Sequence, residues 1–150
     1  MLISLTKVRV WRCNLSKKQR IMIAKNNIFN IRAGRAEWQG MTGTRKGFVE
    51  FIDQEHAIRA WLVLMRNYRR QYHCDSIRKI VTRFAPPSEN NTANYIQFCA
   101  KEVGTLADNR LERYTEYAML AVAMARMETG VRLTWPQVMK VMNKFNVYPY

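Results

Sequence analysis

The sequence predicts an α+β domain that is mainly helical and carries a small β-hairpin lobe. Three observations lead to this class. Apolar residues recur at helical spacing through most of the chain after residue 53, whereas residues 26–53 show no helical period and are punctuated by glycines. Hydrophobic residues make up 48% of the 150 residues, which is enough to form the core of one domain.

Residues 1–25 form a basic segment that we separate from the domain. Within it, residues 2–11 alternate weakly between apolar and polar side chains, which predicts a strand. Lys7, Arg9 and Arg12 interrupt the apolar start and no small-residue cleavage site follows, so no signal peptide is recognisable. No stretch approaches the roughly 20 apolar residues that a membrane-spanning helix needs.

The domain is predicted to cover residues 26–145, followed by a loose tail at residues 146–150. Near its start, residues 37–40 and 47–52 predict two short strands around a glycine-rich turn. These strands supply the hairpin lobe of the predicted fold.

Each helix predicted after the hairpin has a start or a stop signal. Side chains that cap helix N-termini stand at the predicted starts: Asp53, Asp75 or Ser76, Asn91 or Thr92, and Thr134. Pro86 and Pro87 end the second helix, because the residue before a proline avoids helical geometry, and Gly104 ends the third. The inward stripe expected for the first helix shares one helical spacing: Ala57, Ile58, Trp61, Leu62, Leu64, Met65, Tyr68 and Tyr72.

The charge balance favours an anionic partner. The chain has 25 lysines and arginines against 11 aspartates and glutamates, a net charge of +14. Such a surface attracts nucleic acid, a membrane surface or an anionic bacterial wall polymer.

The cysteines predict neither a disulfide framework nor a metal site. Cys13, Cys74 and Cys99 are odd in number, no two of them form a Cys-x-x-Cys pair, and His56 and His73 do not complete a ligand cluster with them. We therefore expect reduced cysteines, no metal and no cofactor.

A glutamate closes the most apolar predicted helix, at about residues 111–127. Residues 117–127 are apolar on nearly every side, so this helix should be central. Glu128 follows, and Thr129 and Gly130 then turn the chain. A carboxyl group at the end of a buried helix can be desolvated, which raises its pKa and suits a general acid near neutral pH. The alternative is an ordinary glutamate in solvent.

Two segments resemble a family of phage and prophage virion proteins. Residues 26–32 read NNIFNIR, where family members read RNNNPGNIR or NPFNIR. Residues 83–95 read RFAPPSENNTANY, where members read RWAPPxENxTxxY. The resemblance covers about residues 20–104 and extends more loosely to Gly130. It implies a muralytic protein with a lysozyme-like, lytic-transglycosylase-like fold, although many members are described only as structural proteins.

The sequence departs from the family pattern in three places. Ile28 replaces a proline and Phe84 a tryptophan, and both stay apolar. In lytic transglycosylases an apolar helix ending Glu-Ser-Gly precedes the asparagine-rich loop, but here no glutamate precedes Asn26. The helix that ends Glu-Thr-Gly at Glu128 resembles the missing helix. We therefore expect a circularly permuted lysozyme-like fold, with this helix packed beside residues 26–32.

The resemblance implies that Glu128 protonates the glycosidic oxygen between N-acetylmuramic acid and N-acetylglucosamine and then acts as a base. A single carboxylate can suffice where groups of the substrate assist. The candidate substrate-binding residues are aromatic, amide or guanidinium groups: Asn27, Asn30, Arg32, Trp38, Phe48, Asn91 and Tyr95. The alternatives are core packing for the aromatic residues and turn formation for the asparagines.

Glu89 is the alternate acid. It precedes a predicted helix, where the helix dipole favours a carboxylate, and it could pair with Arg83 across the proline turn. These structural roles are favoured over catalysis.

Three functions follow from these observations. The first is a phage-derived peptidoglycan glycosidase, and the second is an inactive virion structural or wall-binding protein. The third, a nucleic-acid binder, is the weakest because no known binding motif is present. The expected partners are peptidoglycan strands and other virion proteins, and the expected location is the virion or, after delivery, the bacterial periplasm or cell wall.

Overall fold

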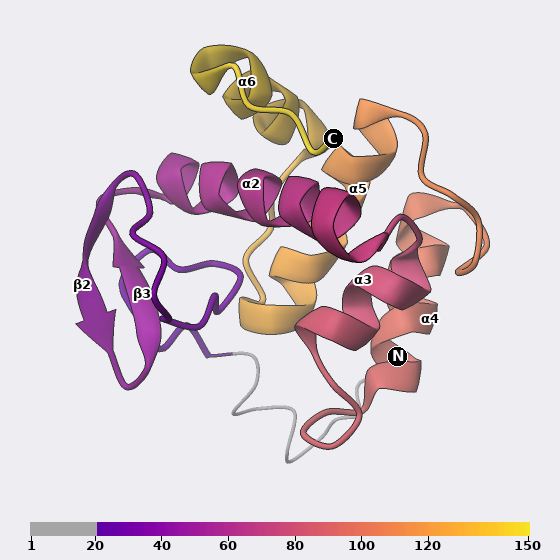
Figure 1. The fold of residues 1–150 in the computed structure, drawn as a ribbon, viewed down its shortest axis with the longest axis horizontal. Coiled ribbons are helices and arrows are strands. Elements are labelled where there is room, and N and C mark those ends of the chain that lie inside the picture. Colours follow the sequence, from indigo (N-terminus) through magenta and orange to yellow (C-terminus); the bar gives the residue numbers. More distant parts are fainter. Residues whose placement is uncertain (1–20) are drawn as a thin grey trace.

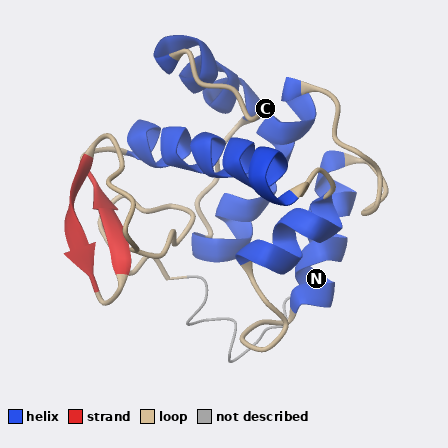
Figure 2. Cartoon of the chain, viewed as in Figure 1, coloured by secondary structure: helices blue, strands red, loops and turns tan. Residues whose placement is uncertain are grey.

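The computed structural model describes residues 21–150, and the strand expected at residues 2–11 lies outside them, as do most of the basic segment and Cys13. The described chain forms a hairpin and then a series of helices (Figures 1 and 2). The elements in order are β2 (Met41–Arg45), β3 (Phe48–Phe51), α2 (Gln54–Tyr72), α3 (Ile77–Phe84), α4 (Thr92–Val103), α5 (Tyr114–Thr129) and α6 (Trp135–Phe145). The predicted class, α+β and mainly helical, is confirmed.

The hairpin pairs β2 with β3 in antiparallel register through a tight turn. Lys46 and Gly47 both have positive φ, 49° and 84°, which is the backbone that two-residue hairpin turns require. The strand predicted at residues 37–40 is wrong, because this segment turns instead of extending. The Met41 N–H bonds to the Trp38 carbonyl at 3.0 Å, and Gly40 has a φ of 81° directly against the His56 ring.

The core is built around α5, which packs against both α4 and α6 (Figure 1). Its buried side chains cover most of its circumference: Tyr117, Ala118, Leu120, Ala121, Ala123, Met124, Ala125 and Met127. The predicted central position is therefore confirmed. The helix begins at Tyr114 instead of residue 111, because the Glu116 carboxylate accepts the backbone N–H groups of Glu112 and Arg113 and fixes the start there.

The predicted caps are confirmed at the four helix starts where they were expected. The capping side chains accept backbone N–H groups three residues ahead: Asp53, Ser76, Asn91 and Thr134. Gly104 ends α4 in the left-handed conformation. One inward assignment is wrong, since Tyr72 is 48% exposed in the last turn of α2, with the Arg83 guanidinium 3.4 Å from its ring centroid.

The tail expected to be loose is packed against the helices. Val147 is buried, and the Tyr150 ring lies under the Arg69 guanidinium at 4.3 Å. The Tyr150 hydroxyl also donates to the Glu112 carbonyl. Aromatic and cation–π contacts, which the apolar periodicity does not reveal, hold this segment in place.

Two further predictions concern cysteines and membranes. Cys74 and Cys99 are free and buried, as expected for reduced thiols in a core. None of the helices in residues 21–150 is both long and apolar enough to cross a bilayer.

Candidate functional site

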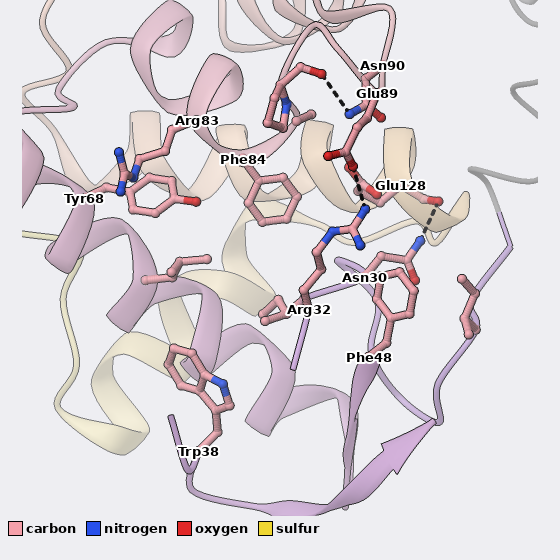
Figure 3. Close-up of a pocket in the computed structure, with 15 residues that line it drawn as sticks. Asn30, Arg32, Trp38, Phe48, Tyr68, Arg83, Phe84, Glu89, Asn90 and Glu128 are labelled. Atoms are coloured by element: carbon pink, nitrogen blue, oxygen red, sulfur yellow. Dashed lines mark hydrogen bonds and ion pairs between the residues drawn. The ribbon is translucent and has the colours of Figure 1, made fainter. Parts of the chain in front are cut away.

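A cavity of about 490 Å³ lies between the hairpin side of the molecule and the helices. Its lining comes from segments far apart in the sequence: Ile23, Asn30, Ile31, Arg32, Trp38, Phe48, Leu64, Tyr68, Arg83, Phe84, Ala85, Pro86, Glu89, Asn90 and Glu128. Figure 3 shows Tyr68 and Arg83 at one end, and Glu128, Asn30 and Phe48 at the other. Phe84 lies between the two ends.

Glu128 reaches this cavity from the last turn of α5, which is tied to the loop before the hairpin. The Asn30 side-chain N–H donates to the Glu128 carbonyl at 3.3 Å, across 98 residues of sequence. The Thr129 hydroxyl donates to the Ile28 carbonyl at 2.8 Å, across 101 residues. The end of the apolar helix therefore packs beside residues 26–32, as we expected from the sequence.

The loop that supplies Asn30 is braced by its own side chains. Asn27 accepts the Ile31 N–H and donates to the Ile31 carbonyl, both at 2.9 Å. Asn30 has a φ of 51°, a left-handed conformation that asparagine tolerates better than most residues. Asn27 is 0% exposed, so the substrate-binding role expected for it is corrected to a structural one.

The electrostatic environment keeps Glu128 protonated up to unusually high pH. Burial raises the pKa of its carboxyl group from 4.5 to about 7, against lowering contributions from hydrogen bonds with Tyr95 and Asn30 and from the charge of Arg32. The Tyr95 hydroxyl donates to Glu128 Oε2 at 3.0 Å. Burial and the neighbouring Glu128 raise the pKa of Tyr95 well above its usual value, so its hydroxyl stays a donor.

Glu89 lies in a different environment from Glu128. It is exposed and its Oε1 accepts from Arg32 Nη2 at 2.9 Å. The expected Arg83–Glu89 pair is wrong, because Arg83 instead lies over the rings of Tyr72 and Tyr68 at 3.4 and 5.6 Å. Of the two candidate acids, Glu128 is therefore the one that the fold desolvates, whereas Glu89 stays exposed.

Two other predicted residues lie away from the cavity surface. Tyr95 is buried behind Glu128 and acts on it through the hydroxyl. Asn91 is exposed and caps α4 by accepting the Asn94 N–H at 3.3 Å, so its substrate-binding assignment is corrected to helix capping. Asn91 uses its side chain in a local helix cap and Tyr95 uses its hydroxyl in a long-range bond to Glu128, so neither lines the cavity as predicted.

No protein-family model matches this sequence. Among curated proteins, Protein P5 of Pseudoalteromonas phage PM2 is 36% identical to the chain over 113 residues. The match spans 72% of this chain and 70% of the phage protein. The chain belongs to the family of this phage protein. The expected phage relationship is thereby confirmed.

Several cavity residues were missed by the sequence interpretation. Leu64 and Tyr68 were assigned only to the inward stripe of α2, yet they line the cavity together with Arg83 and Phe84. The position of Arg83 and Phe84 at the start of the segment 83–95 was the available signal. Trp38 is half-buried and its indole N–H has no hydrogen-bond partner within the part of the chain that the structure describes.

The described residues contain no cluster of three or more histidine, cysteine, aspartate or glutamate side chains placed to hold a metal ion. The chemistry that these residues themselves can supply is proton transfer at Glu128 and anion or sugar binding by Arg32, Trp38 and Phe48.

Proposed function

We propose that this protein is a phage-derived peptidoglycan glycosidase that cleaves the bond between N-acetylmuramic acid and N-acetylglucosamine. The observation that carries the proposal is the Glu128 carboxyl group, which lines a cavity and has a pKa of about 7. A carboxylic acid that remains protonated near neutral pH can donate a proton to a leaving group. Membership of a family with a phage protein supports this biological setting.

In this proposal the transferable proton of Glu128 is assigned to the oxygen that the Tyr95 hydroxyl does not contact. Oε2 accepts from the Tyr95 hydroxyl, so the transferable proton belongs on Oε1. In the proposed reaction this proton passes to the glycosidic oxygen while the bond from that oxygen to the anomeric carbon breaks. The leaving sugar departs with a hydroxyl group, and Glu128 becomes a carboxylate.

The carboxylate then acts as the base for the second half of the reaction. It takes a proton from water, which gives hydrolysis, or from a hydroxyl of the same sugar, which gives an anhydro product. The substrate's acetamido group can stabilise the developing positive charge, which removes the need for a second carboxylate. Mass spectrometry of the released fragments distinguishes the two products, which differ by one water.

The remaining cavity residues have binding roles in this proposal. Trp38 and Phe48 offer aromatic surface to sugar rings. Asn30 and Arg32 lie beside Glu128, where they can contact acetamido and carboxylate groups. The net charge of +14 would concentrate the protein on an anionic wall.

The fold in this proposal is a circularly permuted lysozyme-like fold. The pieces are an apolar helix ending in an acid, an asparagine-rich loop and a hairpin. They lie side by side here, but the loop and hairpin come before the helix in sequence. Delivery in the virion to the periplasm or cell wall, with other virion proteins as partners, belongs to the same proposal.

Clearing of purified murein tests the function and the assigned acid together. We expect the parent protein to clear murein and Glu128→Gln to reduce the rate by about 10²- to 10⁴-fold, since general acid catalysis contributes this much. Glu102→Gln, an exposed site on α4, makes the same chemical change away from the cavity and should keep parental activity. Undiminished clearing by a folded Glu128→Gln protein refutes the assignment.

The second candidate is a wall-binding virion protein without catalysis, favoured by the positive charge alone. In that case the parent protein sediments with murein but releases no fragments.

The alternate acid, Glu89, has its own test. A loss of clearing in Glu89→Gln that equals the loss in Glu128→Gln would make Glu89 a contributor to the chemistry.

A further inference from the structure

One ion pair joins the two sides of the cavity beside Glu128. Arg32 belongs to the loop before the hairpin, and Glu89 belongs to the loop between α3 and α4, 57 residues later. Both residues line the cavity, and their side chains are 71% and 56% exposed. Figure 3 shows the Arg32 guanidinium directed at the Glu89 carboxylate across this opening.

The two loops do not need this ion pair to hold their shape. The Arg32 loop is braced by the paired hydrogen bonds between Asn27 and Ile31. The Glu89 loop is braced by the Asn90 side chain, which donates to the Pro86 carbonyl at 3.2 Å. An exposed ion pair contributes little to stability, so Glu89 can leave Arg32 without loss of the fold.

The Arg32 guanidinium is also oriented as a binding group. It lies over the Phe48 ring at 5.4 Å, which restricts its plane, and its charge reaches Glu128. The other cavity arginine, Arg83, is engaged by the rings of Tyr72 and Tyr68. Of the two arginines that line the cavity, Arg32 is therefore the one whose carboxylate partner, Glu89, can be replaced by another carboxylate.

We propose that Arg32 is a carboxylate-binding site, and that Glu89 occupies it until a carboxylate of the glycan takes its place. The site would then favour acidic glycans over neutral chains of N-acetylglucosamine. This inference rests on the proposed function, because it takes the cavity as a glycan site. The carboxylate can come from the lactyl group of a muramic acid or from an attached stem peptide, and both present the same group to the guanidinium.

Direct binding measurements can separate this role from general electrostatics. Isothermal titration on the full chain, with Glu128→Gln in every protein to prevent turnover, would compare three oligosaccharides. These are a muramic-acid-containing tetrasaccharide with free lactyl groups, the same glycan with stem peptides, and neutral chitotetraose. Comparing the affinities for the first two glycans shows whether the bound carboxylate comes from the lactyl group or from the stem peptide.

The decisive variant is Glu89→Gln, and Asp108→Asn is its matched control. Asp108 also forms an exposed ion pair with an arginine, Arg78, at 2.7 Å, and it does not line the cavity. Both variants remove one negative charge, so both change long-range attraction equally. We expect Glu89→Gln to bind at least one acidic glycan about fivefold more tightly, the scale of an exposed ion pair, with no change for chitotetraose.

Arg32→Gln should abolish the preference for acidic glycans. Equal affinities in Glu89→Gln and Asp108→Asn, or a preference that persists in Arg32→Gln, would overturn the inference. If either of these results is found but the parent protein clears murein, the proposed function stands and only the inference about Arg32 falls. If the parent neither clears murein nor binds any of the three glycans, both fall.

Discussion

Glu128 derives its acidity from a few neighbours with opposing effects. Burial favours the neutral carboxyl group, whereas the Tyr95 and Asn30 hydrogen bonds and the Arg32 charge favour the carboxylate, and the pKa settles at about 7. Asn30 and Arg32 come from the loop before the hairpin, and Tyr95 comes from α4. Changing one of them should therefore shift the pH dependence of the proposed activity before it changes the fold.

Tyr95→Phe tests this balance at a single atom. The change removes the hydroxyl that donates to Glu128 Oε2 but keeps the buried ring. Because that bond lowers the pKa of Glu128, its loss should raise the pKa above about 7 and move the alkaline limb of murein clearing to higher pH. The profile of kcat/KM against pH measures the shift. A limb that moves to lower pH contradicts the assigned role.

The same carboxyl group should make stability depend on pH. The folded-state pKa of Glu128, about 7, lies above the usual 4.5. The contribution of this group to folding stability is therefore fully present below about pH 4.5 and is lost as pH rises through 7. Glu128→Gln cannot ionise and should exceed the parent in stability by about 2 kcal/mol at pH 8, a figure reduced for partial exposure from about 1.4 kcal/mol per pKa unit. Near pH 4 the two proteins should be similar.

Urea unfolding at both pH values provides the measurement, with Glu102→Gln as the exposed control. A parent protein that is as stable as Glu128→Gln at pH 8 would show that Glu128 ionises without penalty in the folded state.

At the scale of elements, α5 both lies at the centre of the core and positions the Glu128 carboxyl group. Leu120 is completely buried in the middle of this helix, whereas Arg126 on the same helix is exposed. Leu120→Ala should lower the free energy of unfolding by about 2–5 kcal/mol, because it leaves a cavity among fixed neighbours. Arg126→Ala should stay within about 0.5 kcal/mol. Chemical denaturation compares the two, and equal losses would contradict a core centred on α5.

Local signals in the sequence predicted the helices well, and long-range packing explains most of the errors. The caps Asp53, Ser76, Asn91 and Thr134 depend on contacts three residues away, so a single sequence reveals them. The first strand was misplaced because the turn at Gly40 is fitted against His56, which the sequence places 16 residues later.

The candidate site shows the same division between local and distant contacts. Asn30, Arg32, Trp38, Phe48 and Glu128 line one cavity as the motifs suggested. Leu64, Tyr68, Arg83 and Phe84 join them through tertiary packing that spacing along the chain does not encode. The two corrected asparagines show how local hydrogen bonds compete with a binding role.

At the scale of the whole molecule, the C-terminal tyrosine links several elements. Tyr150 packs under Arg69 of α2, contacts the Tyr117 ring of α5 and donates to the Glu112 carbonyl. Arg69 in turn donates to the Leu111 carbonyl at 2.8 Å. The tail therefore packs against both α2 and the start of α5 and links these two helices.

Tyr150→Leu should lower the free energy of unfolding by about 1–2 kcal/mol, because it removes a cation–π contact and a hydrogen bond. Tyr148→Phe, which loses only an exposed hydroxyl contact with Asn143, should change stability by less than about 0.5 kcal/mol. Thermal unfolding at one pH compares the two variants. A Tyr150→Leu protein as stable as Tyr148→Phe would mean that the tail contributes no stability.

The position of Glu128 late in the chain has a consequence for synthesis. Ribosomes complete the segments that carry Asn30, Trp38 and Glu89 before they add Glu128. A copy that terminates before Glu128 also lacks α6 and the end of α5, around which the core is built, so it cannot complete the fold. Under the proposed chemistry, faulty translation would then yield no fragment that can cut glycan, because the fold and the proton donor are completed together.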